Sequence, residues 1–171
     1  MKYWIAHCLS FISLVSFSQQ ADISIPPFKR FPTLPPLQLL LGDSTTKYTK
    51  ANIPKKPVLL MVFSPECTHC QHTAEEMVEN KKDLKDIHII MATIHPIFEL
   101  NKFMKKYGLD KMPNVVAGKD IYFLLPPFYG LKNFPYMALY DKKGNLILGF
   151  EGSLSMPKLL QTFKNTAKHK N

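Results

Sequence analysis

The sequence has few cysteines, and this limits how the chain can be stabilised. Only three occur in 171 residues, which excludes the network of disulfide bonds that stabilises many small secreted domains. The chain also lacks an arginine-rich stripe and any alternation of basic with aromatic residues, so nothing in it is typical of a nucleic-acid-binding surface. It shows no internal repeats. Because hydrophobic residues make up 46% of the chain, we expect one domain with a substantial core and no nucleic-acid partner.

The charge of the chain is basic but dispersed. The formal net charge is +9, from 22 basic and 13 acidic residues. Most of the excess is lysine that occurs in short pairs along the sequence rather than in one run. This distribution indicates a solvated surface, with an acidic partner or an anionic membrane face as the alternative.

The first 18 residues have the pattern of a secretory signal peptide. Lys2 is followed by a mostly apolar, uncharged stretch over 3–17, and Ser16 and Ser18 occupy the −3 and −1 positions of a cleavage site before Gln19. The pattern predicts secretion across the inner membrane into the periplasm. The apolar stretch is short for a membrane-spanning helix. An uncleaved anchor that keeps the protein membrane-associated is the alternative.

Removal of this segment takes Cys8 with it and leaves two cysteines, Cys67 and Cys70. One pair at this spacing closes too small a loop to add much stability through chain entropy, so a chemical role explains it better. The pair directly follows an apolar run over 58–63 that predicts a buried strand, and it opens a predicted helix over 71–82. A thiolate at a helix N-terminus is stabilised by free N–H groups and by the helix dipole, which makes Cys67 a candidate nucleophile.

The remaining pattern predicts alternating strands and helices. Proline-rich residues 19–35 are expected to be extended, residues 36–166 to form the domain, and residues 167–171 to be a basic tail. The expected elements of the domain are a hairpin over 37–49, strands 58–63 and 86–93, helices 71–82 and 96–108, strands 136–140 and 146–150 joined by a turn, and a final helix from Pro157. Residues 112–133 show no regular pattern. A strand, a helix and a second strand in succession imply parallel pairing through a right-handed crossover.

Three segments in this order resemble the thioredoxin superfamily and, within it, the secreted TlpA-like/redoxin branch of thiol-disulfide oxidoreductases. They are the strand that leads into Ser64-Pro65-Glu66-Cys67-Thr68-His69-Cys70, the segment Tyr129–Pro135, and the hairpin sequence over 139–147. The resemblance covers about residues 36–166. It implies an α/β thioredoxin-like fold, with a central mixed β-sheet flanked by helices and an N-terminal β-hairpin extension. It also implies exchange of disulfides with protein thiol substrates, without a cofactor.

The cysteine spacing and the resemblance together suggest roles for the site residues. Cys67, being first and more exposed, is the expected nucleophile, and Cys70, one helical turn on, is the expected resolving thiol of a Cys67–Cys70 disulfide. In the family, the proline that corresponds to Pro135 is cis and lies beside the disulfide, and the backbone before it pairs with an extended substrate segment. This likeness implies a substrate-binding role for Phe134 and Pro135.

Residues near the cysteines are expected to tune the site. His69 lies between them, where an imidazole favours the thiolate and makes the disulfide more oxidising than a thioredoxin-type one. Glu66 opposes this effect, although we expect it to face solvent. Thioredoxins often have a buried aspartate six residues before the first cysteine as a proton relay, and this chain has Met61 there. Water or another group must then handle the proton, the candidates being Glu66, Glu75, Glu76 and Glu99.

Two other functions are compatible with the same residues. A zinc half-site would use the two cysteines with histidines, the candidates being His69, His72, His88 and His95. A copper-binding, metallochaperone-like module would use the cysteines with a distant histidine, His88 or His95, although such proteins have a wider cysteine spacing. No second cysteine pair and no His-x-x-x-His motif is present, so we expect redox chemistry and no metal. A non-catalytic adaptor that keeps the fold is the other possibility. A peroxidase is disfavoured, because the residues before Cys67 lack the Pro-x-x-x-Thr-x-x-Cys pattern.

Partners follow from the resemblance. A reductase in an oxidising compartment needs a membrane or periplasmic thiol electron donor, and we expect the protein to be a monomer. The direction of exchange stays open, because TlpA-like proteins usually act as reductases whereas His69 favours a less reducing site. A group of aromatic residues either lines a substrate groove or belongs to the core: Tyr122, Phe123, Phe128, Tyr129, Phe134 and Tyr136.

Overall fold

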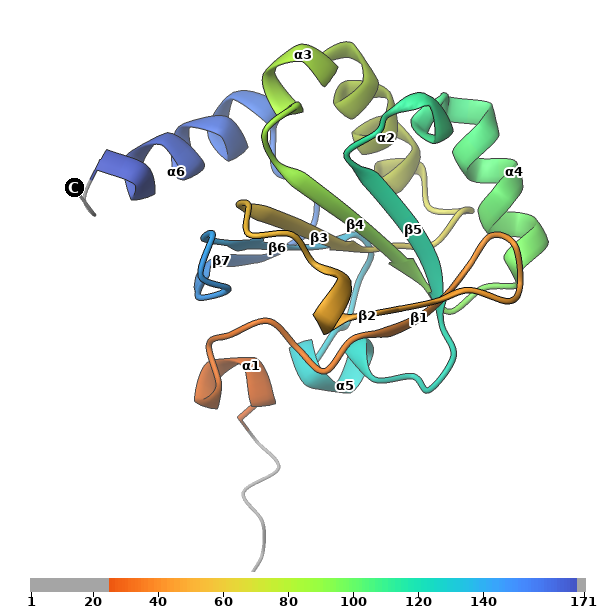
Figure 1. The fold of residues 1–171 in the computed structure, drawn as a ribbon, viewed down its shortest axis with the longest axis horizontal. Coiled ribbons are helices and arrows are strands. Elements are labelled where there is room, and N and C mark those ends of the chain that lie inside the picture. Colours follow the sequence, from red (N-terminus) through yellow and green to blue (C-terminus); the bar gives the residue numbers. More distant parts are fainter. Residues whose placement is uncertain (1–24, 169–171) are drawn as a thin grey trace, which may run out of the picture.

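The computed structural model describes residues 25–168, which form a seven-stranded β-sheet with helices on both faces (Figure 1). The elements in chain order are α1 (Pro27–Arg30), β1 (Gln38–Leu41), β2 (Lys47–Thr49), the 3₁₀ helix η1 (Lys50–Asn52), β3 (Val58–Val62), α2 (Thr68–Glu79), α3 (Lys81–Leu84), β4 (His88–Thr93), α4 (Ile97–Tyr107), the 3₁₀ helix η2 (Leu109–Lys111), β5 (Val115–Asp120), α5 (Leu125–Tyr129), β6 (Tyr136–Tyr140), β7 (Leu146–Glu151) and α6 (Met156–Lys168). The predicted α/β class, with a mixed sheet flanked by helices, is confirmed. The predicted signal peptide lies outside the described residues.

The strand order β2-β1-β5-β4-β3-β6-β7 brings several loops to one edge of the sheet. β4 is parallel to both β3 and β5, as predicted for β3 and β4, whereas β6 runs antiparallel to β3. Parallel strands end at the same edge, so the segments that follow β3, β4 and β5 meet there. Val62 at the end of β3 pairs with Tyr136 at the start of β6, so Pro135 belongs to this edge too. We call it the carboxyl edge.

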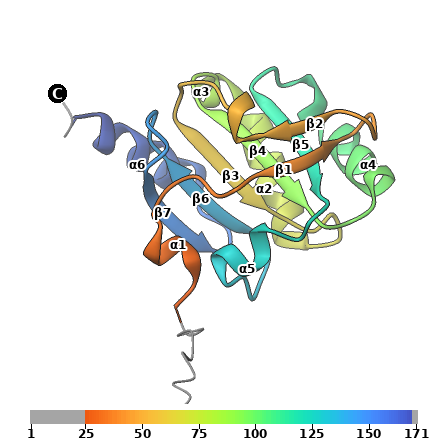
Figure 2. The same ribbon diagram turned by 60° about the horizontal axis from the view of Figure 1, so that its bottom comes forward.

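The sheet separates two hydrophobic clusters, and β3 contributes to both. Leu59 and Met61 belong to the cluster that also holds residues of α2, α3, α4 and α6, whereas Leu60 and Val62 belong to the cluster that holds residues of α5. Figure 2 shows α1 and α5 together on the second face. This alternation follows from the two-residue period of a strand. Truncating Leu59 or Leu60 to alanine is expected to cost ~2–5 kcal/mol of stability.

Strand β5 occupies a place in the sheet where the sequence showed no regular pattern. It lies between β1 and β4, yet its sequence, Val-Val-Ala-Gly-Lys-Asp, combines two charged residues with a glycine, all of which weaken a strand pattern. The glycine has a packing reason, because a Cβ atom on Gly118 would lie 2.7 Å from Cβ of Leu39 on the neighbouring β1. The close approach of two backbones is a tertiary property, and it explains why the sequence pattern missed this strand.

Proline-containing segments form two short helices that the sequence pattern did not indicate. Residues 27–30 form the single turn α1 where an extended chain was expected, and α5 begins directly before Pro126 and Pro127. Proline is tolerated in the first turn of a helix because its missing N–H would have no intrahelical partner there. Phe28 of α1 packs against Tyr129 of α5, with ring centroids 5.8 Å apart.

The predicted N-terminal hairpin is present and continues the main sheet. β1 and β2 pair antiparallel, and β1 also pairs with β5, so the extension shares the sheet of the rest of the domain. The helix predicted over 71–82 differs from the observed structure in its bounds. It begins earlier, at Thr68, and it is interrupted at Asn80, which divides it into α2 and α3. The earlier start places Cys67 at the N-cap of α2.

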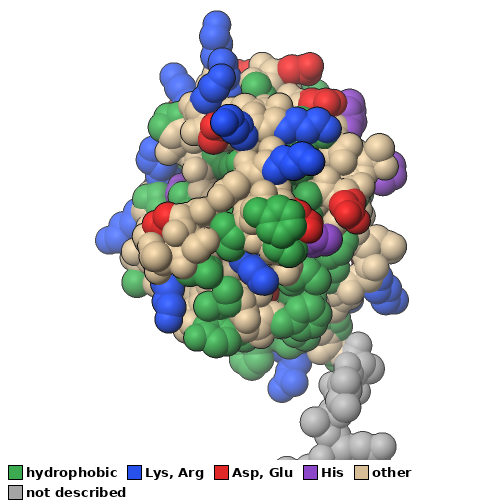
Figure 3. Space-filling model, turned by 90° about the vertical axis from the view of Figure 1, so that its right-hand side faces the viewer, with side chains coloured by type: hydrophobic (Ala, Val, Ile, Leu, Met, Phe, Trp, Pro, Cys, Tyr) green, Lys and Arg blue, Asp and Glu red, His purple; other side chains and the backbone are tan. Residues whose placement is uncertain are grey.

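The surface agrees with the dispersed charge of the sequence. Figure 3 shows the end of the molecule that carries α4, with lysine side chains spread over it rather than gathered in one stripe. Among residues 25–168, none of the helices has the length and apolar character that crossing a bilayer requires.

Candidate functional site

Cys67 lies where β3 passes into α2, at the carboxyl edge. Its backbone N–H donates to the carbonyl of Ser64 at 3.2 Å, which closes the loop after β3, and its Sγ accepts the N–H of Cys70 at 3.3 Å as the N-cap of α2. The Cys67 thiol also donates to the carbonyl oxygen of Phe134 at 3.4 Å. The side chain is partly exposed. The sulfur therefore touches both the start of a helix and the segment before β6, and it remains accessible to solvent.

Cys70 lies one turn further along α2 and is completely buried. Both cysteines are free thiols in this structure and they lie close together. Burial raises the pKa of the Cys70 thiol far above its ordinary value, and the hydrogen bond with Cys67 raises it further. Cys70 is therefore a neutral thiol near pH 7, and it must lose its proton before its sulfur can attack.

A pocket of about 570 Å³ opens in front of Cys67, lined by Ser64, Glu66, Cys67, His69, Asn133, Phe134, Glu151 and Gly152. The peptide bond between Phe134 and Pro135 is cis, as the resemblance implied. Asn133 donates to the Glu151 carboxylate at 3.0 Å, which joins the segment before β6 to the end of β7. The pocket thus places the carbonyl oxygen of Phe134, the Cys67 sulfur and two carboxylates around one opening.

The two residues expected to tune the site are both exposed at this opening. The carbonyl oxygen of His69 accepts hydrogen bonds from the hydroxyls of Thr73 at 2.8 Å and Ser153 at 3.3 Å, which fix the backbone between the cysteines. Its imidazole is exposed, and so is the side chain of Glu66, which therefore faces solvent as expected. Any effect of either charge on the sulfur is screened by water.

Met61, at the position where thioredoxins often have a buried aspartate, lies in an apolar environment. Met61 is fully buried in the same cluster as Cys70. Of the glutamates considered as replacements, Glu75 and Glu76 lie 3.8 Å from His72 on an exposed side of α2. Glu99 instead lies at the carboxyl edge, where its carboxylate hydrogen-bonds with His95, which in turn contacts Ser64.

Ser64 and His95 form a contact that the sequence analysis did not identify. Ser64 follows β3 and His95 follows β4, so the parallel pairing of the two strands brings them together at the carboxyl edge. Nε2 of His95 lies 3.1 Å from the Ser64 hydroxyl, and its Nδ1 lies 2.9 Å from the Glu99 carboxylate. The available signal was a polar residue within two positions of the end of each of two consecutive predicted strands.

The six aromatic residues that were expected either to line a substrate groove or to belong to the core do not all lie in one place. Tyr129 and Tyr136 belong to the buried cluster on the α5 face, and Phe134 lines the pocket at Cys67. Tyr122 and Phe123 are exposed in the loop after β5. Phe128 is partly buried against the same cluster. Two members of the group are therefore core and two are exposed, and Phe134 contributes to the opening in front of the sulfur.

The remaining histidines do not join the cysteines. His88 is buried at the start of β4, at the opposite end of that strand from the carboxyl edge, and hydrogen-bonds with the Tyr48 hydroxyl at 2.7 Å. Burial lowers the pKa of His88, and the charge of Lys56 lowers it further. In the described part of the chain, no group of three or more histidine, cysteine, aspartate or glutamate side chains is arranged to hold a metal ion.

Comparison with solved structures finds close likeness of fold at low identity. A secreted disulfide oxidoreductase of Mycobacterium tuberculosis, homologous to Escherichia coli DsbE, is 15% identical, with a TM-score of 0.62 over 74% of this chain and 92% of its own. A thiol:disulfide interchange protein of Chlorobium tepidum is 16% identical, with a TM-score of 0.65 over 78% of this chain and 94% of its own. The exposed lipoprotein thioredoxin of Streptococcus pneumoniae is 23% identical, with a TM-score of 0.59 over 76% of this chain and 98% of its own. At such identities, the likeness shows a shared fold.

Sequence comparison gives the family. A search of curated proteins finds no match, but the family model described as a thioredoxin-like domain matches residues 45–167, which is most of the chain. The match spans β3, the cysteine pair, the cis-proline and the final hairpin. It confirms the resemblance to the thioredoxin superfamily, and two of the proteins with a similar fold are named as a disulfide oxidoreductase and a thiol:disulfide interchange protein. The chain therefore belongs to the thioredoxin-like domain family.

Proposed function

We propose that this protein is an exported thiol-disulfide oxidoreductase that exchanges disulfides with protein substrates through Cys67 and Cys70. The position of the Cys67 sulfur supports this most strongly. It caps α2, accepts the Cys70 N–H at 3.3 Å and opens into a pocket beside the cis-proline segment. The fully buried Cys70 lies directly behind it. An accessible sulfur backed by a second, protected sulfur is the arrangement that exchange through a mixed disulfide requires.

The reaction proceeds in two displacements. The Cys67 thiolate attacks one sulfur of a substrate disulfide, a Cys67–substrate bond forms, and the other substrate sulfur leaves as a thiolate that takes a proton. Cys70 then loses its proton and attacks Cys67, so that the Cys67–Cys70 disulfide forms and the second substrate thiol is released. The substrate gains two electrons and two protons, and the protein loses the same number. A thiol electron donor in the membrane or periplasm reverses the change in the protein.

The segment before β6 is the proposed binding site for the substrate backbone. The carbonyl oxygen of Phe134 lies 3.4 Å from the Cys67 sulfur, so an extended peptide paired with Phe134 and Pro135 would bring its own disulfide against Cys67. Main-chain pairing of this kind tolerates many sequences. His69 and Glu66 lie at the same opening, where they would adjust the balance between thiol and thiolate.

Export is part of the proposal. Two of the fold neighbours are named as a secreted oxidoreductase and an exposed lipoprotein, and residues 1–18 have the pattern of a signal peptide. The proposed organisation is a signal peptide over 1–18, a proline-rich segment over 19–35, the catalytic domain over 36–166 and a basic tail. The periplasm is the proposed location, and the protein would act there as a monomer.

One experiment tests the activity and the export together. The full-length chain is expressed in a Gram-negative host and recovered from the periplasm, and reduction of insulin disulfides is followed with dithiothreitol as electron donor. We expect turnover that Cys67→Ser abolishes, and an N-terminus at Gln19 by mass spectrometry. Wild-type protein that does not reduce insulin and does not form a Cys67–Cys70 disulfide in glutathione buffers contradicts the proposal and favours a non-catalytic adaptor.

A further inference from the structure

A chain of hydrogen bonds joins the cysteine loop to α4. The Glu99 carboxylate accepts the Nδ1–H of His95 at 2.9 Å, which leaves Nε2 as the acceptor for the Ser64 hydroxyl at 3.1 Å. Side chains of His95 and Glu99 are 25% and 29% exposed, and Ser64 is buried. The three groups therefore run from the interior toward solvent, with the histidine held in one orientation.

Ser64 connects this chain to both cysteines. Its carbonyl oxygen accepts the backbone N–H of Cys67 at 3.2 Å, and a hydrogen bond from its backbone lowers the pKa of the Cys70 thiol, against the larger effect of burial. The imidazole of His95 therefore contacts the side chain of a residue whose backbone meets both cysteines. His72 on α2 instead lies 3.8 Å from Glu75 and Glu76 of its own helix, beyond hydrogen-bonding distance.

The proposed exchange requires a base that accepts the proton of Cys70. Cys70 is buried and its raised pKa keeps it protonated near neutral pH, but its sulfur must be deprotonated to resolve a mixed disulfide. The buried position at which thioredoxins often have a carboxylate is occupied here by Met61, which cannot accept a proton. A base at another place in the fold is therefore required.

We propose that Ser64, His95 and Glu99 form the proton path for Cys70, with His95 as the acceptor and Glu99 as the group that orients it. This inference rests on the proposed function and names the residues that serve its second step. The Cys70 S–H bond breaks and the electron pair on sulfur forms the bond to Cys67. The Cys67–substrate bond breaks, and its electron pair leaves on the substrate sulfur. The proton passes by way of the Ser64 hydroxyl to Nε2 of His95.

The far end of the path opens to solvent. Glu99 lines a second pocket of about 250 Å³ between α4 and the loop before α2, together with Pro65, Glu66, Gln71, Lys102, Phe103, Lys106 and Tyr107. The imidazolium formed on His95 can return its proton to water, because its side chain is itself 25% exposed. The charged groups that line this pocket are Glu99, Lys102 and Lys106 on α4 and Glu66 before α2, and Tyr107 is its other titratable group. Cys67 and the exposed His69 line the neighbouring pocket, which shares Glu66, and Cys70 is buried behind Cys67. His95 acts through Ser64 and is therefore a positioning residue rather than a catalytic one.

Single-turnover kinetics of the full-length protein separate the two steps. Reduced protein is mixed with a peptide disulfide, samples are quenched with acid, and mass spectrometry follows the mixed disulfide as it forms and disappears between pH 5 and 9. We expect His95→Gln to slow the disappearance about 100-fold at neutral pH, near the lower end for a positioned base. The same variant should lack the inflection that protonation of the histidine gives to the plot of this rate against pH. The rate at which the mixed disulfide forms at Cys67 should change little. Ser64→Ala should behave in the same way, Ser64→Thr should restore the rate because it keeps a hydroxyl, and His72→Gln is the matched control.

The outcomes distinguish this proposal from the proposed function. If His95→Gln folds and resolves the mixed disulfide with the rate and pH profile of the wild type, the path is wrong and the oxidoreductase activity stands. If the wild type forms no mixed disulfide, the proposed function fails. NMR of the reduced protein then judges the path alone. In the wild type and in His72→Gln, the chemical shift of Cys70 Cβ should change with pH together with the ring signals of His95, and in His95→Gln this change should be absent. A Cys70 Cβ shift with the same pH dependence in His95→Gln and in the wild type overturns the path.

Discussion

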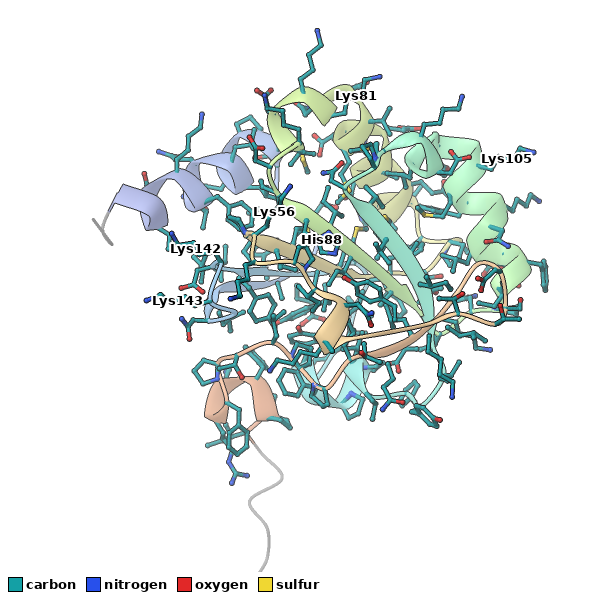
Figure 4. The ribbon with its side chains drawn as sticks, in the orientation of Figure 1. Lys56, Lys81, His88, Lys105, Lys142 and Lys143 are labelled. Atoms are coloured by element: carbon teal, nitrogen blue, oxygen red, sulfur yellow. The ribbon has the colours of Figure 1, made fainter. Side chains whose placement is uncertain are left out.

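The two ends of the parallel strands carry pockets of opposite character. The carboxyl edge has the opening at Cys67, whose ionisable side chains are one thiol, one imidazole and the carboxylates of Glu66 and Glu151. The other end has a pocket of about 380 Å³ lined by five lysines together with Leu34, Ile53, Pro54, Val58, Asp141 and Gly144, the lysines being Lys50, Lys55, Lys56, Lys142 and Lys143. Figure 4 shows Lys56, Lys142 and Lys143 near the start of β3 and the turn between β6 and β7. We call this end the lysine end.

The contacts at the two ends explain the difference. At the lysine end, Lys50 donates to the carbonyl oxygen of Leu34 at 3.1 Å, and the Asp141 carboxylate accepts the N–H groups of Lys143 and Asn145 at 2.9 Å each. These hydrogen bonds shape loops. At the carboxyl edge, by contrast, Ser64 and Phe134 are hydrogen-bonded to Cys67, and His95 contacts Ser64. One sheet thus supports a scaffold at one end and chemistry at the other, as is general for sheets of this kind.

The largest effect is expected from Cys70→Ser at the carboxyl edge. Without the resolving sulfur, Cys67 still attacks a substrate disulfide but cannot release it, so turnover falls to background while a covalent complex accumulates. Non-reducing gel electrophoresis with a protein disulfide substrate detects the complex, and Cys67→Ser is the control that forms none. A Cys70→Ser variant with wild-type turnover would show that the two sulfurs do not act as a pair.

A smaller effect is expected from His69→Ala at the same opening. Removing an imidazole that favours the thiolate should make the reduction potential about 30 mV more negative, which is tenfold in the equilibrium constant. Equilibration with glutathione buffers measures the potential, and His72→Ala, which changes an exposed histidine of the same helix outside the pocket, is the control. A shift to a less negative potential would contradict the role proposed for His69.

At the other end of β4, His88 should affect stability rather than exchange. Its pKa is lowered by burial from the ordinary 6.5, so between that value and the lowered one the unfolded chain binds more protons than the folded chain. The contribution of neutral His88 to stability is therefore present above about pH 6.5 and is lost as the pH falls through the folded pKa. Urea unfolding at pH 7.5 and 5 should show a larger loss for the wild type than for His88→Gln.

The partner of His88 gives a matched measurement. Tyr48→Phe removes the hydroxyl that lies 2.7 Å from Nε2 of His88 and should cost ~1 kcal/mol in the free energy of unfolding at pH 7.5. The rate of insulin reduction should not change. An altered rate would mean that the two ends of the strands are coupled.

The smallest effect is expected at the lysine end. Lys142 and Lys143 are exposed, and replacing both by alanine should change the free energy of unfolding by less than about 0.5 kcal/mol and leave turnover as it is. Thermal unfolding and insulin reduction measure the two quantities. A marked loss of turnover would instead indicate that an acidic partner binds at this end.

The sequence predicted the parts of the fold that have strong local patterns. The continuous apolar run before Cys67 predicted β3, and the helical spacing after Pro96 predicted α4, which runs from Ile97 to Tyr107. The proline before the hairpin suggested the cis bond at Pro135 through resemblance alone. β5 was missed because the close packing of Gly118 on Leu39 cannot be read from a strand pattern that contains a glycine and two charges.

The candidate site was predicted only in part, for a related reason. Cys67 and Cys70 are three residues apart, so local spacing was enough to find them. Glu99 was one of four candidate glutamates, and nothing in the sequence separated it from Glu75 or Glu76. His95 and Ser64 are 31 positions apart, and only the pairing of β3 with β4 joins them.

By itself the sequence determined where the paired cysteines lie and which strongly patterned segments become strands and helices, because those properties depend on residue type and on periods of two to four residues. The tertiary structure alone decided that one sulfur is partly exposed and the other fully buried, and that a histidine after β4 meets Ser64 in the loop before Cys67. Burial and long-range hydrogen bonds depend on which strands become neighbours in the sheet, and that arrangement is set by the packing of the whole chain.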